Sequence, residues 1–151
     1  MDSTKVTEQL QRIEELFAAD NSSREDAPFI SVEEWLQLLN QESVLLVDVR
    51  TKEEQQISMI PGAISKEEFE SNLEKYRSCK VISYCTIGGR AGAYTQGLRK
   101  RGIDAFNLKG SVLLWAHAGK KFVDSAGQET TRVHVSGSKW DLLPQGYEAI
   151  W

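Results

Sequence analysis

The sequence is poor in the residues that build metal centres and disulfide frameworks. Its 151 residues include only two cysteines and two histidines, which excludes a disulfide-rich scaffold and a four-cysteine zinc site and argues against a His-rich metal site. We expect no metal and no cofactor. The longest apolar runs, such as 44–47 and 112–116, fall far short of the ~20 residues that span a bilayer. The N-terminus lacks an apolar signal core, so we expect a cytoplasmic protein without a membrane partner, whose thiols are reduced.

Acidic and basic residues are unevenly distributed. The formal net charge is -4, and residues 1–28, with seven acids and three bases, account for all of it. Residues 86–121 hold seven bases and one acid. A positive field there would favour an anionic substrate and a thiolate; alternatively, residues 99–101 form only the solvated last turn of a helix. Aromatic residues do not interleave with these bases, so we expect no nucleic-acid partner.

Short apolar runs alternate with helical patterns along the middle of the chain. Strands are predicted at 44–47, 80–84 and 105–108. Helices are predicted after a capping box formed by Ser31 and Glu34, and at 66–76, 90–100 and 111–115. Strands that alternate with helices at this spacing predict an α/β fold with a parallel sheet flanked by helices.

Two segments lie outside this pattern, at 1–28 and 123–151. The first begins with a predicted amphipathic helix over 5–19, whose apolar stripe contains Val6, Leu10, Ile13 and Phe17, and continues as a polar linker over 19–26. The second holds three large aromatic residues, which we expect to pack on the domain or on a partner: Trp140, Tyr147 and Trp151. We therefore divide the chain into 1–28, a domain over 29–122, and a tail over 123–151.

The loop after the second predicted strand has the composition of an anion-binding site. Its sequence is Cys85-Thr-Ile-Gly88-Gly89-Arg90, between a strand end and a helix start, where ligands bind in α/β sheets. The glycines let successive N–H groups turn toward one centre, and the helix dipole and Arg90 add positive potential. This setting favours a reactive thiolate at Cys85; otherwise Cys85 is a small buried side chain and the glycines form a turn.

Four motifs, in order, resemble those of the rhodanese-like domains. They are Val44-Leu-Leu-Val-Asp48-Val-Arg50, Ile60-Pro-Gly-Ala-Ile64, the loop from Cys85 to Arg90, and Asn107-Leu-Lys-Gly110, which is followed by Trp115 and Gly119. The resemblance covers roughly residues 29–122. It implies a parallel sheet flanked by helices, and a sulfurtransferase that moves sulfane sulfur from a donor such as thiosulfate to a thiol, a protein acceptor or cyanide.

The same resemblance implies roles for individual residues. Cys85 attacks the donor and becomes a persulfide, and the acceptor then removes the outer sulfur. Binding of the donor and the persulfide falls to the rest of the loop: Thr86, Ile87, Gly88, Gly89 and Arg90. Asp48 and Arg50 position this loop or form a structural ion pair. Arg90 binds the negative charge of the donor or holds the loop.

Some positions depart from the family pattern. Ser58-Met59 stand where Gly-His often precedes the Ile-Pro-Gly turn, Ser111 replaces the second glycine of the closing motif, and Ala91 replaces a serine. None of these changes removes the nucleophile.

Two other functions remain open. Cysteine phosphatases and arsenate reductases place five residues between cysteine and arginine, whereas here there are four. A non-enzymatic sulfur carrier or an interaction module would also keep this fold. Cys79, six residues upstream at about 3.3 Å per residue, is out of disulfide reach of Cys85 and is interpreted as structural. His117, on the exposed side of the last helix, and His134, in the tail, carry no motif. The oligomeric state stays open.

Overall fold

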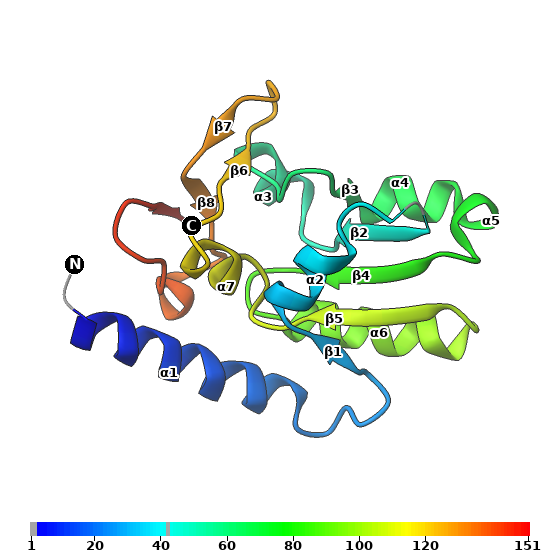
Figure 1. The fold of residues 1–151 in the computed structure, drawn as a ribbon, viewed down its shortest axis with the longest axis horizontal. Coiled ribbons are helices and arrows are strands. Elements are labelled where there is room, and N and C mark those ends of the chain that lie inside the picture. The colour runs from blue at the N-terminus through cyan, green and yellow to red at the C-terminus, as the bar shows by residue number, and fades with distance from the viewer. Residues whose placement is uncertain (1–2, 42) are drawn as a thin grey trace.

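A five-stranded parallel sheet forms the centre of the fold, as predicted. The computed structural model describes residues 3–41 and 43–151, and its sheet has the order β1-β5-β4-β2-β3 (Figure 1). The strands are β1 Phe29–Ile30, β2 Val44–Asp48, β3 Ile64–Ser65, β4 Lys80–Tyr84 and β5 Asp104–Leu108. The three central strands match the predicted ones, whereas β1 and β3 contain two residues each and are too short to show a pattern.

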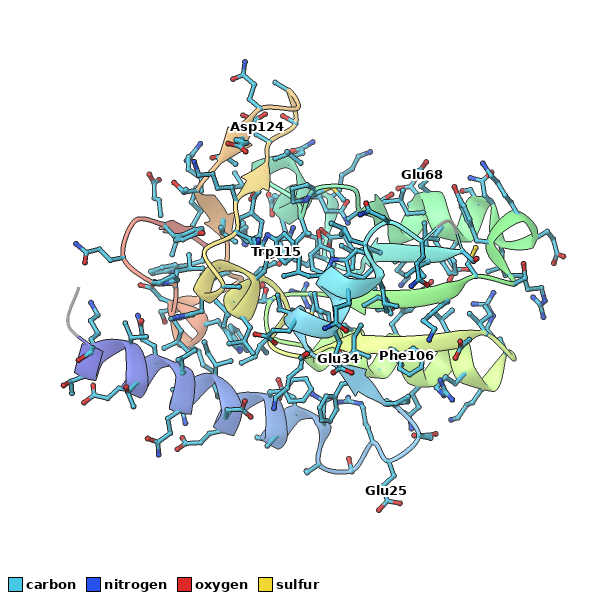
Figure 2. The ribbon with its side chains drawn as sticks, viewed as in Figure 1. Glu25, Glu34, Glu68, Phe106, Trp115 and Asp124 are labelled. Carbon is cyan, nitrogen blue, oxygen red and sulfur yellow. The ribbon has the colours of Figure 1, made fainter. Side chains whose placement is uncertain are left out.

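Helices cover both faces of this sheet, and alternate strand residues supply the two halves of the core. Leu46, Ile82 and Leu108 pack with residues of α1 Ser3–Asn21, α2 Val32–Leu38 and α7 Ser111–His117. Val47, Val81 and Ala105 pack with residues of α4 Lys66–Ser71 and α6 Gly89–Lys100. Burial on both faces explains why these strands are continuous apolar runs. Trp115, labelled in Figure 2, lies in the first half of the core.

Local capping explains where several helices begin and end. The predicted Ser31–Glu34 capping box is present. The predicted helix over 66–76 is instead α4 followed by α5 Leu73–Tyr76, because Asn72 leaves helical geometry at φ −126° and ψ 31°. α3 Lys52–Ile57 was not predicted, although Thr51 and Glu54 form a second capping box at its start. The helix predicted over 90–100 ends before Gly102, whose φ of +79° suits glycine.

The N-terminal helix α1 packs against α6 and α7 and runs along the lower edge of the domain in Figure 1. It continues to Asn21, so the linker predicted from residue 19 begins later. Its buried face consists of Ile13, Leu16 and Phe17. The predicted stripe is wrong at Leu10, which is 37% exposed, because α1 meets the domain mainly through its C-terminal half.

The C-terminal segment forms two small sheets beside the main one. β6 Phe122–Val123 pairs antiparallel with β7 Glu129–Thr130, and β8 Arg132–His134 pairs parallel with β9 Glu148–Ile150. Trp140, in the 3-10 turn η1 Ser138–Trp140, and Tyr147 pack on the core, as predicted. Trp151 is 58% exposed, so most of its surface is not covered by the domain.

Both extensions meet over the same side of the domain. The Gln9 side-chain amide donates to the Leu143 carbonyl oxygen at 2.9 Å, which links α1 to the C-terminal segment. Ser58, buried and at a position that departs from the family pattern, donates through Oγ to the Arg132 carbonyl oxygen at 2.6 Å.

None of the helices in residues 3–41 and 43–151 is long and apolar enough to cross a bilayer.

Candidate active site

The Cys85 loop lies at the carboxyl end of β4, at the centre of the sheet. β4 ends at Tyr84 and α6 starts at Gly89, so the loop turns directly from a strand into a helix N-terminus. Cys85 is only 2% exposed. Its Sγ accepts a hydrogen bond from the Gly88 N–H at 3.1 Å. A backbone donor at the head of a helix therefore faces the sulfur. The sequence predicted several loop N–H groups around this centre, and the Gly88 N–H is the one that is hydrogen-bonded to Sγ among the described residues.

Two neighbouring elements hold the backbone of this loop. The Asn107 side-chain amide, from β5, donates to the Gly88 carbonyl oxygen at 2.8 Å. At the start of α7, the Val112 and Leu113 N–H groups donate to the Cys85 and Thr86 carbonyl oxygens, both at 3.3 Å. These hydrogen bonds hold the carbonyl oxygens of the loop. This arrangement leaves the loop N–H groups free to face the sulfur.

The serine that replaces glycine at position 111 has its own contact with the loop. Ser111 Oγ accepts the Cys85 N–H at 3.1 Å and donates to the Leu108 carbonyl oxygen at 3.0 Å. Its φ of +46° lies in the left-handed region, which is uncommon for residues other than glycine. The hydroxyl satisfies a buried backbone donor, and this gain offsets the backbone strain.

Gly88 is a position where only glycine fits. Its φ is +118°, and a Cβ there would lie 2.7 Å from the ring of Phe17 and 3.3 Å from Asn107 Nδ2. Phe17 belongs to α1 and is 5% exposed. The N-terminal helix therefore packs directly on the back of the loop that carries Cys85.

Arg90 is held by a cluster of polar side chains. Its guanidinium donates to both carboxylate oxygens of Glu54, at 2.7 and 3.0 Å, and to the hydroxyls of Thr86 at 3.2 Å and Ser136 at 3.0 Å. The hydrogen bonds with Glu54 raise the pKa of Arg90. Of the two roles expected for Arg90, this geometry favours holding the loop, since its charge is already balanced.

Glu54 is the buried centre of that cluster. Its Oε2 accepts from Ser136 Oγ at 2.7 Å, and its Oε1 accepts the Thr51 N–H at 3.0 Å. Burial alone would raise the pKa of Glu54, but the hydrogen bonds from Arg90, Ser136 and the Thr51 backbone outweigh it and hold that pKa well below its usual range. Glu54 is therefore a carboxylate that neutralises Arg90.

Most bases of the stretch over 86–121 are paired with acids. Besides Arg90, four of its seven bases pair with acids elsewhere on the surface: Arg99 with Asp104 at 3.7 Å, Arg101 with Glu70 at 3.3 Å, Lys109 with Glu14 at 2.9 Å and Lys121 with Glu129 at 3.8 Å. These pairs balance most of the charge of the stretch, and the positive field expected at the loop stays a prediction.

Asp48 and Arg50 form a fully buried ion pair at 2.8 Å. The Tyr84 hydroxyl donates to Asp48 Oδ2 at 2.6 Å. Burial and, to a smaller extent, the negative charge of Asp48 raise the pKa of Tyr84 well above its usual range. Arg50 also donates to the carbonyl oxygens of Ser58 at 2.7 Å and His134 at 3.3 Å. The pair thus contacts the residue before Cys85 and the C-terminal segment.

A small pocket opens beside the sulfur. Its volume is about 180 Å³, and it is lined by Asp20, Cys85, Thr86, Ile87, Gly89, Arg90, Ser136 and Trp140. All of the predicted loop residues except Gly88 line it. Sequence reasoning missed Asp20, Ser136 and Trp140, which come from the two extensions, and Glu54 behind them. Only Glu54 had a visible signal, since it lies three residues after Thr51.

The remaining candidates lie away from the sulfur. His117 is half-buried rather than exposed, because its Nε2 is 2.8 Å from the Leu142 carbonyl oxygen, and burial lowers its pKa. His134 Nδ1 accepts the Ser136 N–H at 3.1 Å and lies 3.9 Å from Glu54, behind the pocket. Cys79 precedes β4, at the opposite end of the strand from Cys85, and both thiols are free. The described residues hold no group of three side chains suited to a metal ion.

This fold and site define a class of protein. The family model of the rhodanese-like domain matches residues 31–118, and the chain belongs to that family. Its fold resembles the thiosulfate sulfurtransferase of Pseudomonas aeruginosa, with a TM-score of 0.62 and 25% identity over 78% of this chain and 23% of that one. It also resembles the polysulfide-sulfur transferase homodimer of Wolinella succinogenes, with a TM-score of 0.56 and 21% identity over 77% and 93% of the two chains.

Among curated proteins, the chain is similar to tRNA uridine(34) hydroxylases. That of Acinetobacter baylyi is 27% identical over 78% of this chain and 46% of its own length. That of Ruegeria pomeroyi is 32% identical over 56% of this chain and 32% of its own length. The chain thus spans less than half the length of these relatives.

Proposed function

We propose that this chain is a sulfurtransferase that moves sulfane sulfur from a small donor, such as thiosulfate, to a thiol or to cyanide through a persulfide on Cys85. The observation that carries the proposal is the position of the Cys85 sulfur, which faces a pocket at a helix N-terminus and accepts the Gly88 N–H at 3.1 Å. Persulfide formation needs such a nucleophile with donors for a sulfur anion.

The first half-reaction loads the cysteine. The Cys85 thiolate attacks the outer sulfur of thiosulfate, a bond forms between Sγ and that sulfur, and the sulfur–sulfur bond of the donor breaks. Sulfite leaves with the electron pair, and the persulfide anion remains on Cys85. In the second half-reaction the acceptor attacks the outer sulfur, and the Cys85 thiolate leaves. Two separate half-reactions predict ping-pong kinetics.

The loop residues have distinct parts in this proposal. The N–H groups over residues 86–90 bind the persulfide sulfur, while Arg90 with Glu54 fixes the shape of the loop. Asp48 and Arg50 are positioning residues that act through Tyr84. Ser111 holds the loop by accepting the Cys85 N–H. The four residues between Cys85 and Arg90, one fewer than in cysteine phosphatases and arsenate reductases, support sulfur transfer over phosphatase or arsenate reductase chemistry.

The carrier and the tRNA-directed functions are the alternatives. A carrier would accept sulfur from the donor and release it only to one partner protein. The similarity to tRNA uridine(34) hydroxylases covers only 46% of the A. baylyi protein. Hydroxylation of tRNA by this chain would therefore be a separate proposal. We expect no tRNA binding, because most bases of the 86–121 stretch are paired with acids.

Mass spectrometry of the intact protein tests the proposal. After prolonged incubation with an excess of a sulfane donor, either thiosulfate or a thiosulfonate, the wild type and Cys79→Ser should gain one sulfur atom (~32 Da), with sulfite or sulfinate released in equal amount. Cys85→Ser should gain none. Cyanide should then remove the sulfur as thiocyanate with turnover. A gain without turnover to cyanide or small thiols supports the carrier, and no gain on Cys85 with any sulfane donor refutes the proposal.

A further inference from the structure

Asp20 is an acidic residue of the N-terminal helix that lines the Cys85 pocket. Its carboxylate lies over the first residue of α6, since a Cβ on Gly89 would come within 2.7 Å of Asp20 Oδ2. The 12-residue helix α6 directs its positive end toward this point. The Asp20 carboxylate therefore occupies the position beside the sulfur where an anionic group of a donor would be attracted.

No cation in the described part of the chain pairs with this carboxylate. Arg24 donates to the backbone carbonyl oxygen of Asp20, and Arg90, the nearest base of the loop, is bound to Glu54 through both carboxylate oxygens. Two charged side chains line the pocket, Asp20 and Arg90. Because Glu54 balances the charge of Arg90, the Asp20 carboxylate is the charge in the pocket lining that has no paired counter-charge among the described residues.

We propose that Asp20 is a specificity-determining residue that makes Cys85 discriminate against multiply charged anions. The donor preference rests on the proposed sulfurtransferase function and makes that function more specific. The preferred donor is a small organic sulfane-sulfur compound with little or no net negative charge, whose carbon portion contacts Ile87 and Trp140 in the pocket. Thiosulfate, a dianion, would then be a poor donor for the wild type.

Alkylation of Cys85 measures this discrimination without any sulfur transfer. Iodoacetate and iodoacetamide have nearly the same size and react with the same thiolate, but only iodoacetate is an anion. In a Cys79→Ser background, Asp20→Asn should raise the ratio of the iodoacetate rate to the iodoacetamide rate about fivefold, and Asp20→Lys should raise it further. Half-molar salt should shrink the difference. A change in thiol reactivity itself cancels in the ratio.

The second measurement is kcat/KM for three donors that differ in charge but react in the same way. Thiosulfate carries two net negative charges, methanethiosulfonate carries one, and 2-aminoethanethiosulfonate is a zwitterion with none. In each, Cys85 attacks the outer sulfur and a sulfite or sulfinate leaves with the electron pair. Asp20→Asn should raise kcat/KM about 25-fold for thiosulfate and about fivefold for methanethiosulfonate, and should leave the zwitterion nearly unchanged.

Glu25→Gln is the matched control, because it removes one negative charge from the turn after α1 while the side chain points away from the domain (Figure 2). It should change neither ratio. Equal ratios in the wild type, Asp20→Asn and Glu25→Gln overturn the role of Asp20, whatever the donor results. If the alkylation ratio shifts as expected but no donor leaves sulfur on Cys85, the electrostatic role stands and the sulfurtransferase proposal fails.

Discussion

Replacing Glu54 with glutamine tests the cluster that holds Arg90. Glutamine keeps the size of the side chain and can still complete the capping box with Thr51, so the main loss is the charge opposite Arg90. Hydrogen bonds to charged groups contribute about 1.5–3 kcal/mol. The Arg90 side chain is 42% exposed and can regain water, which lowers the expected loss to about 1–2 kcal/mol. At this chain length, that corresponds to a fall in Tm of about 3–6 °C.

The dependence of this loss on pH follows from the low pKa of Glu54. The folded protein keeps Glu54 ionised to a lower pH than the unfolded chain does. Its contribution to the free energy of unfolding is therefore complete above the usual value of 4.5 and declines as the pH falls below it. Urea unfolding at pH 7, 5, 4 and 3 should show a gap between the wild type and Glu54→Gln that narrows at the two lowest values.

The neighbouring acid provides a control on the same helix. Glu53 is exposed in the first turn of α3, and Glu53→Gln should change the free energy of unfolding by no more than about 0.5 kcal/mol. If Glu54→Gln costs no more than Glu53→Gln at pH 7, or if its gap from the wild type is as large at pH 3, the Glu54–Arg90 pair does not stabilise the loop as described.

Three further substitutions test the loop and the second cysteine. Gly88→Ala should lower the free energy of unfolding by more than Gly102→Ala, for which ~1–2 kcal/mol is expected. Both glycines have positive φ, but only a Cβ on Gly88 would meet Phe17. Equal losses in urea unfolding would contradict that contact. Ser111→Ala should cost about 1–3 kcal/mol, because the Cys85 N–H loses its acceptor, and a neutral result would refute that role. Cys79→Ser should keep the rate of sulfur loading, measured by mass, and a loss of loading would show that Cys79 participates.

Local sequence signals predicted the centre of the fold but not the walls of the pocket. The buried strands β2, β4 and β5 are continuous apolar runs, and the Cys85 loop was identifiable because its residues are adjacent in sequence. Asp20 and Ser136 reach the same pocket through helix docking and long-range hydrogen bonds, which no short-range pattern encodes. The partner of Arg90 was missed for the same reason, since Glu54 lies 36 residues upstream.

The origin of the pocket walls bears on how the protein is made. Asp20 and Ser136, which face the same sulfur, are 116 positions apart (136 minus 20). At 5–20 residues per second, a ribosome needs on the order of ten seconds to pass from one to the other. Through part of that time, the Cys85 segment has already been synthesised while the C-terminal wall has not. The growing chain therefore carries the Cys85 thiol before Ser136 and Trp140, two residues that line its pocket, have been added.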